Sequence, residues 1–152
     1  GEDVRKIYGF DVFFKDMPDD FTEKWSKGIF KLPNLPKLDK DKVELIEGYF
    51  EETLEKFLEE HQDKASFVHM DADIYVSTKY VLNTLSKFDR FQVGTIIQFD
   101  ELFFNLDEYW YNGEYLAMKE WVEEYKIKYE YIGIHECHTS IKIKEINNHD
   151  QT

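Results

Sequence analysis

The sequence has few of the residues that fix a fold covalently, and it has no long apolar run. Its 152 residues include one cysteine, seven glycines and three prolines. The single cysteine, Cys137, excludes an internal disulfide, and its strand-like neighbours predict a small buried side chain rather than a nucleophile. No apolar run approaches the roughly 20 residues that cross a bilayer, and no signal peptide opens the sequence. We therefore expect a cytoplasmic protein.

Positive charge is also scarce. Nineteen lysines and arginines stand against 32 aspartates and glutamates, which gives a net charge of −13. Affinity for nucleic acid depends on basic side chains that neutralise phosphates, so we expect no nucleic-acid partner and no anionic membrane surface as partner. The length suits one domain with a single core, and the 17% of aromatic residues predicts an interior rich in rings.

What the sequence does contain is an alternation of strand-like and helical segments. Short apolar runs predict strands, and apolar residues at helical spacing predict helices. The predicted strands cover residues 6–10, 43–47, 66–70, 94–99, 129–135 and 138–146, and the predicted helices cover residues 50–58, 77–88 and 114–125. A loop with all three prolines and one helical turn around residues 22–27 follows the first strand. This alternation predicts a doubly wound α/β fold.

The last two predicted strands lie too close together in the sequence for a crossover helix. They are therefore expected to form an antiparallel hairpin at the edge of the sheet. Within the last strand, Ile141 and Ile143 are expected to face the core, and Lys142 and Lys144 the solvent. No G-x-G run follows the first strand, although many doubly wound folds bind a nucleotide with a glycine-rich turn there. Either this fold does without the turn or that first βα unit is absent from the chain.

Two acidic clusters close two of the predicted strands. Residues 66–70 run into Asp71-Ala72-Asp73, and residues 94–99 run into Asp100-Glu101. If these strands are parallel neighbours, their carboxyl ends place four acids at one edge of the sheet, where ligands bind in such folds. Four nearby carboxylates repel one another unless a cation lies among them or one of them holds a proton. We interpret the clusters as a site for a divalent metal.

Five segments of the sequence, in order and at consistent spacing, carry a family resemblance. They are Tyr8-Gly9-Phe10-Asp11-Val12-Phe13 with Met17-Pro18, Gly48 to Leu54 (GYFEETL), His69 to Thr78 (HMDADIYVST), Gly94 to Glu101 (GTIIQFDE) and Gly113-Glu114-Tyr115. Through them the chain resembles the macrocin O-methyltransferase family of class I S-adenosylmethionine-dependent methyltransferases, from about residue 8 to residue 133. The resemblance implies a Rossmann-like methyltransferase sheet that ends in an antiparallel hairpin.

Members of that family have an upstream strand and a glycine-rich loop that grip the methionine end of the cofactor. No segment of this sequence matches them. We therefore expect residues 1–146 to form a partial class I methyltransferase domain without its first βα unit, and residues 147–152 to form a polar tail. The expected consequence is weak or absent affinity of this chain alone for the cofactor.

The resemblance also assigns residues to the cofactor, S-adenosyl-L-methionine. Asp11 ends the first strand, where a carboxylate can accept hydrogen bonds from both ribose hydroxyls; the alternative is an exposed loop acid. Gly48, Tyr49 and Phe50 follow the second strand, where the family places the adenine ring, although a simple turn between strand and helix explains them as well. Asp71 is assigned both to the cofactor and to the metal.

The resemblance further assigns the acids of the two clusters. Asp71, Asp100 and Glu101 are the predicted metal ligands, and their hard oxygen atoms suit Mg²⁺, whereas no Cys or His spacing supports zinc. The alternative is that they cap helices or face solvent. Asp73 is the candidate general base for the acceptor hydroxyl, or else an acid that favours the dipole of the next helix. His69 is an alternative base, but it lies within a strand and is therefore interpreted as a core histidine.

An aromatic stretch follows the second acidic cluster. It contains Phe103, Phe104, Tyr109, Trp110 and Tyr111. These rings form one wall of an acceptor pocket, because sugars and flat molecules stack on aromatic faces, or else they pack a helix against the sheet or make a subunit contact.

The predicted function is that of an S-adenosylmethionine- and Mg²⁺-dependent O-methyltransferase. The expected acceptor is a hydroxyl group of a small molecule or glycan, and a sugar hydroxyl is the first candidate. A metal-dependent glycosyltransferase is one alternative, because Asp71-Ala72-Asp73 also fits the D-x-D motif that holds a metal and a nucleotide-sugar diphosphate. A truncated, non-catalytic binding module is the other. The sequence leaves the acceptor and a homo-oligomeric state open.

Overall fold

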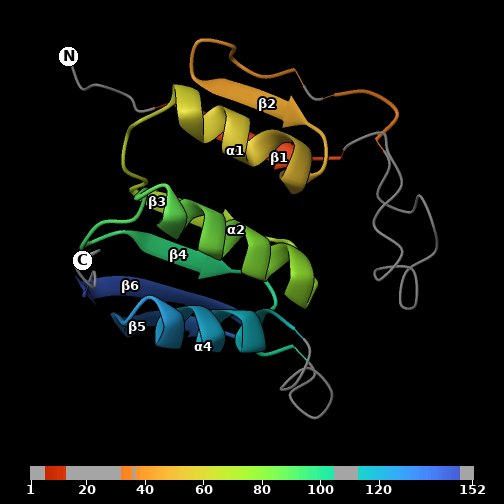
Figure 1. The fold of residues 1–152 in the computed structure, drawn as a ribbon. Coiled ribbons are helices and arrows are strands. Elements are labelled where there is room, and N and C mark those ends of the chain that lie inside the picture. Colours follow the sequence, from red (N-terminus) through yellow and green to blue (C-terminus); the bar gives the residue numbers. More distant parts are fainter. Residues whose placement is uncertain (1–5, 13–31, 36, 105–112, 148–152) are drawn as a thin grey trace. The chain divides into compact units, whose positions relative to one another are not determined.

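The computed structural model describes residues 6–12, 32–35, 37–104 and 113–147 of the chain (Figure 1). The helices and strands in chain order are β1 (Ile7–Asp11), β2 (Val43–Glu47), α1 (Phe50–Glu60), β3 (Phe67–Met70), α2 (Tyr75–Lys87), β4 (Ile96–Phe99), α4 (Glu114–Glu124), β5 (Ile127–His135) and β6 (His138–Ile146). All six predicted strands and all three longer predicted helices are therefore confirmed, whereas the helical turn predicted around residues 22–27 lies outside the described residues. No helix in the described ranges is long and apolar enough to cross a membrane. The contacts divide the chain into two compact units, residues 1–57 and residues 58–152, which we describe one at a time.

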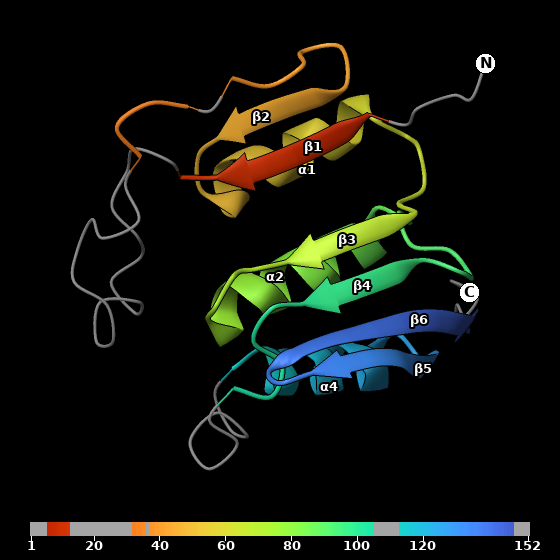
Figure 2. The ribbon, with the colours of Figure 1, turned by 180° about the vertical axis from the view of Figure 1, so that it is seen from behind.

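The first unit holds a two-stranded parallel sheet with a helix on one face. β1 and β2 pair along the whole length of both strands, so both end at the same edge. α1 follows β2 directly and lies across one face of the pair (Figures 1 and 2). Phe57 of α1 packs against Tyr8 and Phe10 of β1, with ring centroids 4.6 and 5.0 Å apart. These edge-to-face contacts hold the helix against the sheet.

The second unit is built on a four-stranded sheet in the order β3-β4-β6-β5. β3 and β4 are parallel neighbours, as the sequence predicts, with Met70 opposite Phe99 at their carboxyl ends. β6 pairs antiparallel with β4 on one side and with β5 on the other. β5 and β6 thus form the predicted hairpin, and the two acidic clusters leave the sheet from adjacent strands.

α2 and α4 cover one face of this second sheet and pack against each other (Figures 1 and 2). Strand residues of the core include Ile97, Ile141 and Ile143, each 0% exposed, while the two lysines predicted to face solvent are not buried. Trp121 of α4 lies in the same core, and its indole nitrogen donates a hydrogen bond to the hydroxyl of Ser86 in α2 over 2.7 Å. The predicted inward orientation of the two isoleucines of β6 is therefore confirmed.

α2 begins earlier than the sequence predicts. Its expected start at Ser77 or Thr78 is wrong, because the helix begins at Tyr75 and no side chain caps it. The chain turns at Asp73, where φ is 57°, and the next amide donates to the carbonyl two residues back over 2.6 Å. This tight turn starts the helix through the backbone, so no hydroxyl cap is needed. Thr78 is instead fully buried within the helix.

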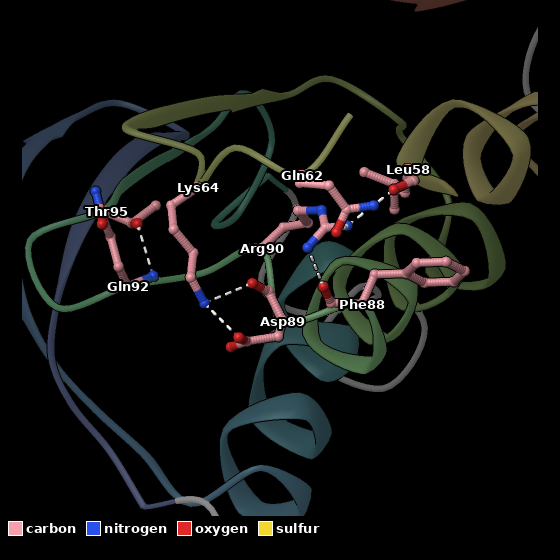
Figure 3. A network of polar contacts seen from close by, with 8 residues as sticks. All are labelled: Leu58, Gln62, Lys64, Phe88, Asp89, Arg90, Gln92 and Thr95. Atoms are coloured by element: carbon pink, nitrogen blue, oxygen red, sulfur yellow. Dashed lines mark hydrogen bonds and ion pairs between the residues drawn. The ribbon is translucent and has the colours of Figure 1, made fainter. Parts of the chain in front are cut away.

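The amino-terminal ends of β3 and β4 lie next to a network of polar contacts around Arg90, which Figure 3 shows. Arg90 is only 7% exposed. Its terminal nitrogens donate to the carbonyls of Leu58 and Phe88 and to the side-chain oxygen of Gln62. Leu58 lies near the end of α1, and Phe88 directly follows α2. One side chain therefore provides donors for the carbonyl ends of two helices.

Thr95 connects the strand starts at the same end of the sheet. Its buried hydroxyl donates to the carbonyl of Ala65 over 2.6 Å and accepts from the amide of Gln92 over 3.1 Å (Figure 3). Close by, the ammonium group of Lys64 pairs with the carboxylate of Asp89 over 2.6 Å. At this end of the second unit, the buried hydroxyl and the terminal nitrogens of the buried guanidinium are bonded to protein atoms.

Candidate functional site

The carboxyl ends of β3 and β4 meet in the second unit. Asp71 directly follows β3, and Asp100 and Glu101 directly follow β4. The amide of Asp100 donates to the carbonyl of Met70 over 2.9 Å, which continues the strand pairing as far as the acids. Asp71 is exposed, whereas Asp100 and Glu101 are half-buried. The structure thus places the three predicted metal ligands at one edge of the sheet.

Asp73 is turned toward the same cluster by its backbone. Its φ of 57° lies in the left-handed region, which aspartate tolerates better than most residues. Its half-buried carboxyl forms a hydrogen bond with the side chain of Glu101 and is within electrostatic reach of Asp71 and Asp100. Burial, followed by the nearby charges of these acids, raises the pKa of Asp73 to about 7. The structure therefore brings together all four acids that the sequence singles out.

A fifth carboxyl, that of Glu114, belongs to this cluster, and the sequence analysis did not identify it as a site residue. Glu114 is the first residue of α4 and is 1% exposed. Its Oε2 accepts a hydrogen bond from the amide of Glu101 over 3.1 Å, while its Oε1 has no hydrogen-bond partner among the described residues. An acid at the first position of a helix usually indicates only an interaction with the helix dipole. The burial that distinguishes Glu114 depends on how α4 packs.

The environment of Glu114 strongly disfavours its charged form. Burial raises its pKa to about 8, although the amides of Glu101 and Ala72 favour the carboxylate. The charges of Asp73 and Glu101 raise the pKa in the same direction as burial. Negative charge is therefore crowded at this end of the sheet.

His69 is not the core histidine that the sequence predicts. Its side chain is 49% exposed, and its Nε2 lies 3.7 Å from Oδ1 of Asp100. Successive residues of a strand point to opposite faces. Met70 is buried on the face that the helices cover, so His69 points to the other face, beside the acids.

His138 is a second histidine at the cluster, and it also escaped the sequence analysis. Its Nδ1 lies 3.1 Å from Oδ1 of Asp100, without the alignment of a hydrogen bond. β6 runs antiparallel beside β4, with Thr139 opposite Phe99. Because the two strands run in opposite directions, His138, just before Thr139, lies next to Asp100, just after Phe99. The predicted hairpin could have revealed His138. Pairing the second strand of the hairpin with the second acidic strand brings the start of that strand to the acids.

The donor chemistry of the cluster fits a divalent cation. Carboxylate oxygens are the ligands that Mg²⁺ prefers. Asp73 and Glu101 can share a hydrogen bond only if one of the two carboxyls is protonated, whereas a bound cation would let both stay ionised. Within the part of the chain that the structure describes, no three Asp, Glu, His or Cys side chains are already arranged as a metal site. The residues thus supply suitable ligands, and side-chain rotation has to gather them around an ion.

The residues predicted to bind the cofactor lie in both units. Asp71 belongs to the second unit, and the other four belong to the first. Asp11 is exposed at the end of β1, and its carbonyl accepts a hydrogen bond from the amide of Gly48 over 3.0 Å. Gly48 is buried with a φ of 145°, a conformation that residues with a Cβ rarely adopt. Tyr49 and Phe50 follow it, both half-buried, so these four candidates share one edge of the first unit.

The predicted aromatic wall is only partly described. Three of its members, Tyr109, Trp110 and Tyr111, lie outside the described residues. Phe103 is half-buried and contacts the rings of Tyr115 and Tyr131, with centroids 6.0 and 6.2 Å apart. Phe104 is 37% exposed. The packing alternative accounts for Phe103.

No protein-family model and no curated protein matches the chain, whereas several solved structures do. The structure of CalS11, a calicheamicin methyltransferase, has a TM-score of 0.65 at 22% identity, and the match covers 91% of this chain and 60% of CalS11. An apo structure of CalS11 is described as that of a TDP-rhamnose 3'-O-methyltransferase. The O-methyltransferase NovP has a TM-score of 0.66 at 17% identity, with 95% of this chain and 62% of NovP covered. The SAH-bound methyltransferase PaMTH1 of Podospora anserina has a TM-score of 0.53 at 16% identity, with 95% of this chain and 63% of PaMTH1 covered.

At these identities the likeness establishes the fold. It confirms the predicted α/β fold class and, at the level of the fold, the resemblance to class I methyltransferases. The chain spans less than two thirds of the length of each of these proteins.

Proposed function

We propose that this chain belongs to an S-adenosylmethionine-dependent O-methyltransferase that acts on a hydroxyl group with the help of Mg²⁺. The observation that carries the proposal is the meeting of Asp71, Asp73, Asp100 and Glu101 at the carboxyl ends of two parallel strands. Ligands bind at this edge of parallel α/β sheets. The fold is shared with solved structures of O-methyltransferases, which supports the reaction class.

S-adenosylmethionine is the proposed methyl donor, and one of the similar structures is bound to SAH. Asp11 would accept hydrogen bonds from the ribose hydroxyls, because it ends a parallel strand and is exposed. Gly48, Tyr49 and Phe50 would border the adenine ring, and the missing side chain of Gly48 lets the base approach the backbone.

The proposed chemistry needs a base and aligned reactants. Asp71, Asp100 and Glu101 would hold Mg²⁺, which supplies Lewis acidity for the acceptor hydroxyl. Asp73 would take the hydroxyl proton while the acceptor oxygen bonds to the methyl carbon and the carbon–sulfur bond of the donor breaks. The left-handed turn at Asp73 supports this role, because it aims the carboxyl at the other acids.

A sugar hydroxyl is the proposed acceptor. One similar protein is described as a TDP-rhamnose 3'-O-methyltransferase. Exposed histidine and acidic side chains beside the cluster can hydrogen-bond to sugar hydroxyls.

Isothermal titration calorimetry separates this function from its alternatives. The chain is titrated with SAH and, separately, with a uridine-diphosphate sugar, each with and without Mg²⁺. Because no segment of this chain matches the glycine-rich cofactor loop, we expect at most weak binding of SAH, together with binding of Mg²⁺ and no binding of the nucleotide sugar. Mg²⁺-dependent binding of the nucleotide sugar alone would favour a glycosyltransferase, and no binding of SAH, of the nucleotide sugar or of Mg²⁺ would favour a non-catalytic module.

The role of Asp73 is tested with a matched pair of variants. Asp73 and Asp89 have φ values of 57° and 56°, and asparagine tolerates this conformation as well as aspartate does. We expect Asp73→Asn to lower methyl transfer from labelled S-adenosylmethionine to a panel of TDP-sugars by about 100-fold or more, because the amide cannot accept the proton. Asp89→Asn should leave the rate unchanged. Equal rates for both variants would contradict the assignment of Asp73.

A further inference from the structure

Glu114 has no place in the reaction described so far, although it is the most deeply buried acid of the cluster. It is 1% exposed, and it comes from the start of α4 rather than from either strand. Its contact with the cluster is through the backbone, because its Oε2 accepts from the amide of Glu101 over 3.1 Å. Its other oxygen, Oε1, has no hydrogen-bond partner among the described residues.

A buried carboxyl of this kind is a poor choice for stability alone. Burying a charged or unpaired polar atom costs free energy, and an apolar side chain of similar size avoids that cost. The main groups that act on Glu114 are two backbone amides and two further acids, and none of these groups carries a positive charge. The position therefore calls for a reason other than stability.

Glu101 provides that reason. It follows Asp100 directly after β4, and the next residue, Leu102, is 1% exposed and anchors the chain in the core. The amide bonded by Glu114 lies between the strand end and this anchor. Fixing that amide fixes the backbone from which the side chain of Glu101 extends toward Asp73.

We propose that Glu114 is a positioning residue for the metal-binding pair Asp100-Glu101. Through Oε2 it holds the amide of Glu101, and it thereby sets the direction in which both carboxylates of the pair meet a divalent cation. The inference rests on the proposed function, because it assigns Glu114 to the cation site of the same reaction. Groups that orient metal ligands in this way commonly change metal affinity by about 10- to 100-fold when they are replaced.

Two substitutions separate positioning from charge. Glu114→Gln keeps an oxygen at the right distance for the Glu101 amide but cannot ionise. Glu114→Asp keeps an ionisable carboxyl group and withdraws the oxygen by one methylene group. Glu120, in the same helix but 37% exposed, provides the matched controls Glu120→Gln and Glu120→Asp.

The measurements are the affinity of the chain for Mg²⁺ by calorimetry and the hydrogen-exchange rate of the Glu101 amide in metal-free protein. Circular dichroism checks that each variant is folded. We expect Glu114→Gln to bind Mg²⁺ within about 3-fold of the wild type and to keep the Glu101 amide protected. Glu114→Asp should bind about 10-fold more weakly or worse and exchange that amide faster. Both Glu120 variants should match the wild type.

The outcomes distinguish this inference from the proposed function. If the wild type binds no divalent cation, the metal part of the proposed function fails, and the inference fails with it. If the wild type binds Mg²⁺ and both Glu114 variants bind it equally well, only the inference is overturned. A loss of affinity in Glu114→Gln of about 10-fold or more would also overturn it, because the charge would then matter rather than the hydrogen bond.

Discussion

The two ends of β3 and β4 treat their buried polar groups in opposite ways. At the amino-terminal end, the terminal nitrogens of Arg90 bond three oxygen atoms, and the hydroxyl of Thr95 both donates and accepts (Figure 3). At the carboxyl-terminal end, Asp73 and Glu101 share a hydrogen bond between two acids, and Oε1 of Glu114 has no partner in the described part of the chain. At the amino-terminal end, Nε of Arg90 is the exception, because it has no partner in the described part of the chain. The same pair of strands thus has one end where most buried polar side-chain atoms are bonded and one end crowded with like charge.

This difference teaches which end is adapted to folding and which to a ligand. Polar groups that are bonded inside the protein stabilise the fold, whereas unpaired or like-charged groups oppose it. Conflicts of this kind collect at functional sites, where a ligand resolves them. The acid end therefore carries the proposed site, and the Arg90 end holds the second unit together.

The largest effect that sharpens this comparison is expected from Arg90→Met. Methionine keeps most of the apolar stem but leaves the carbonyls of Leu58 and Phe88 without their donor. We expect the free energy of unfolding to fall by about 3 kcal/mol, as estimated for two buried acceptors left unpaired. Urea denaturation followed by circular dichroism measures it. Lys64→Met, which breaks a partly exposed ion pair with Asp89, should cost no more than about 0.5 kcal/mol. Equal losses in the two variants would contradict the role of Arg90.

A smaller, pH-dependent effect is expected at the acid end. The pKa of Glu114 is raised from 4.5 to about 8, so between these values the folded protein holds a proton that the unfolded chain has released. The stability due to this proton is complete below pH 4.5 and is lost as the pH rises through about 8. In metal-free buffer, Glu114→Gln should match the wild type near pH 4.5, and its free energy of unfolding should exceed that of the wild type increasingly as the pH rises toward 8. Urea denaturation at several pH values measures this difference in the free energy of unfolding. A difference between variant and wild type that does not change with pH would contradict the raised pKa of Glu114.

The smallest effect is expected from two buried threonines, one at each end. Thr95→Val removes a hydroxyl with two hydrogen bonds and should lower the free energy of unfolding by about 1 kcal/mol. Thr139, opposite Phe99 beside the acids, is 1% exposed, and its hydroxyl has no partner among the described residues. Thr139→Val should therefore be neutral or stabilising. Thermal unfolding of both variants checks the sign, and a loss in Thr139→Val as large as in Thr95→Val would refute the contrast.

Much of the fold could be predicted because its signals are local. The alternation of buried and exposed residues identified β6 as a strand with Ile141 and Ile143 inward, and its short distance from β5 predicted the hairpin. The start of α2 could not be predicted in the same way. Ser77 and Thr78 are good caps in isolation, but the backbone turn at Asp73 starts the helix before either of them.

Some residues of the candidate site could likewise be predicted from the sequence, and others could not. Asp71, Asp100 and Glu101 could be placed together because the ends of adjacent parallel strands meet at one edge. His69 was misjudged, because a position inside a strand does not reveal whether its face is covered. Phe67, two residues earlier on that uncovered face, is likewise 55% exposed.

By itself, then, the amino-acid order determined the succession of strands and helices. The order strand, helix, strand, with acids after each strand, was enough to predict the parallel pair and the four acids at its end. Only the tertiary structure decided that Glu114 is buried against the amide of Glu101 and that His138 lies beside Asp100. These contacts depend on how α4 and β6 pack beside the end of β4. Burial, pairing and the resulting pKa values arise from such packing, and no local pattern encodes them.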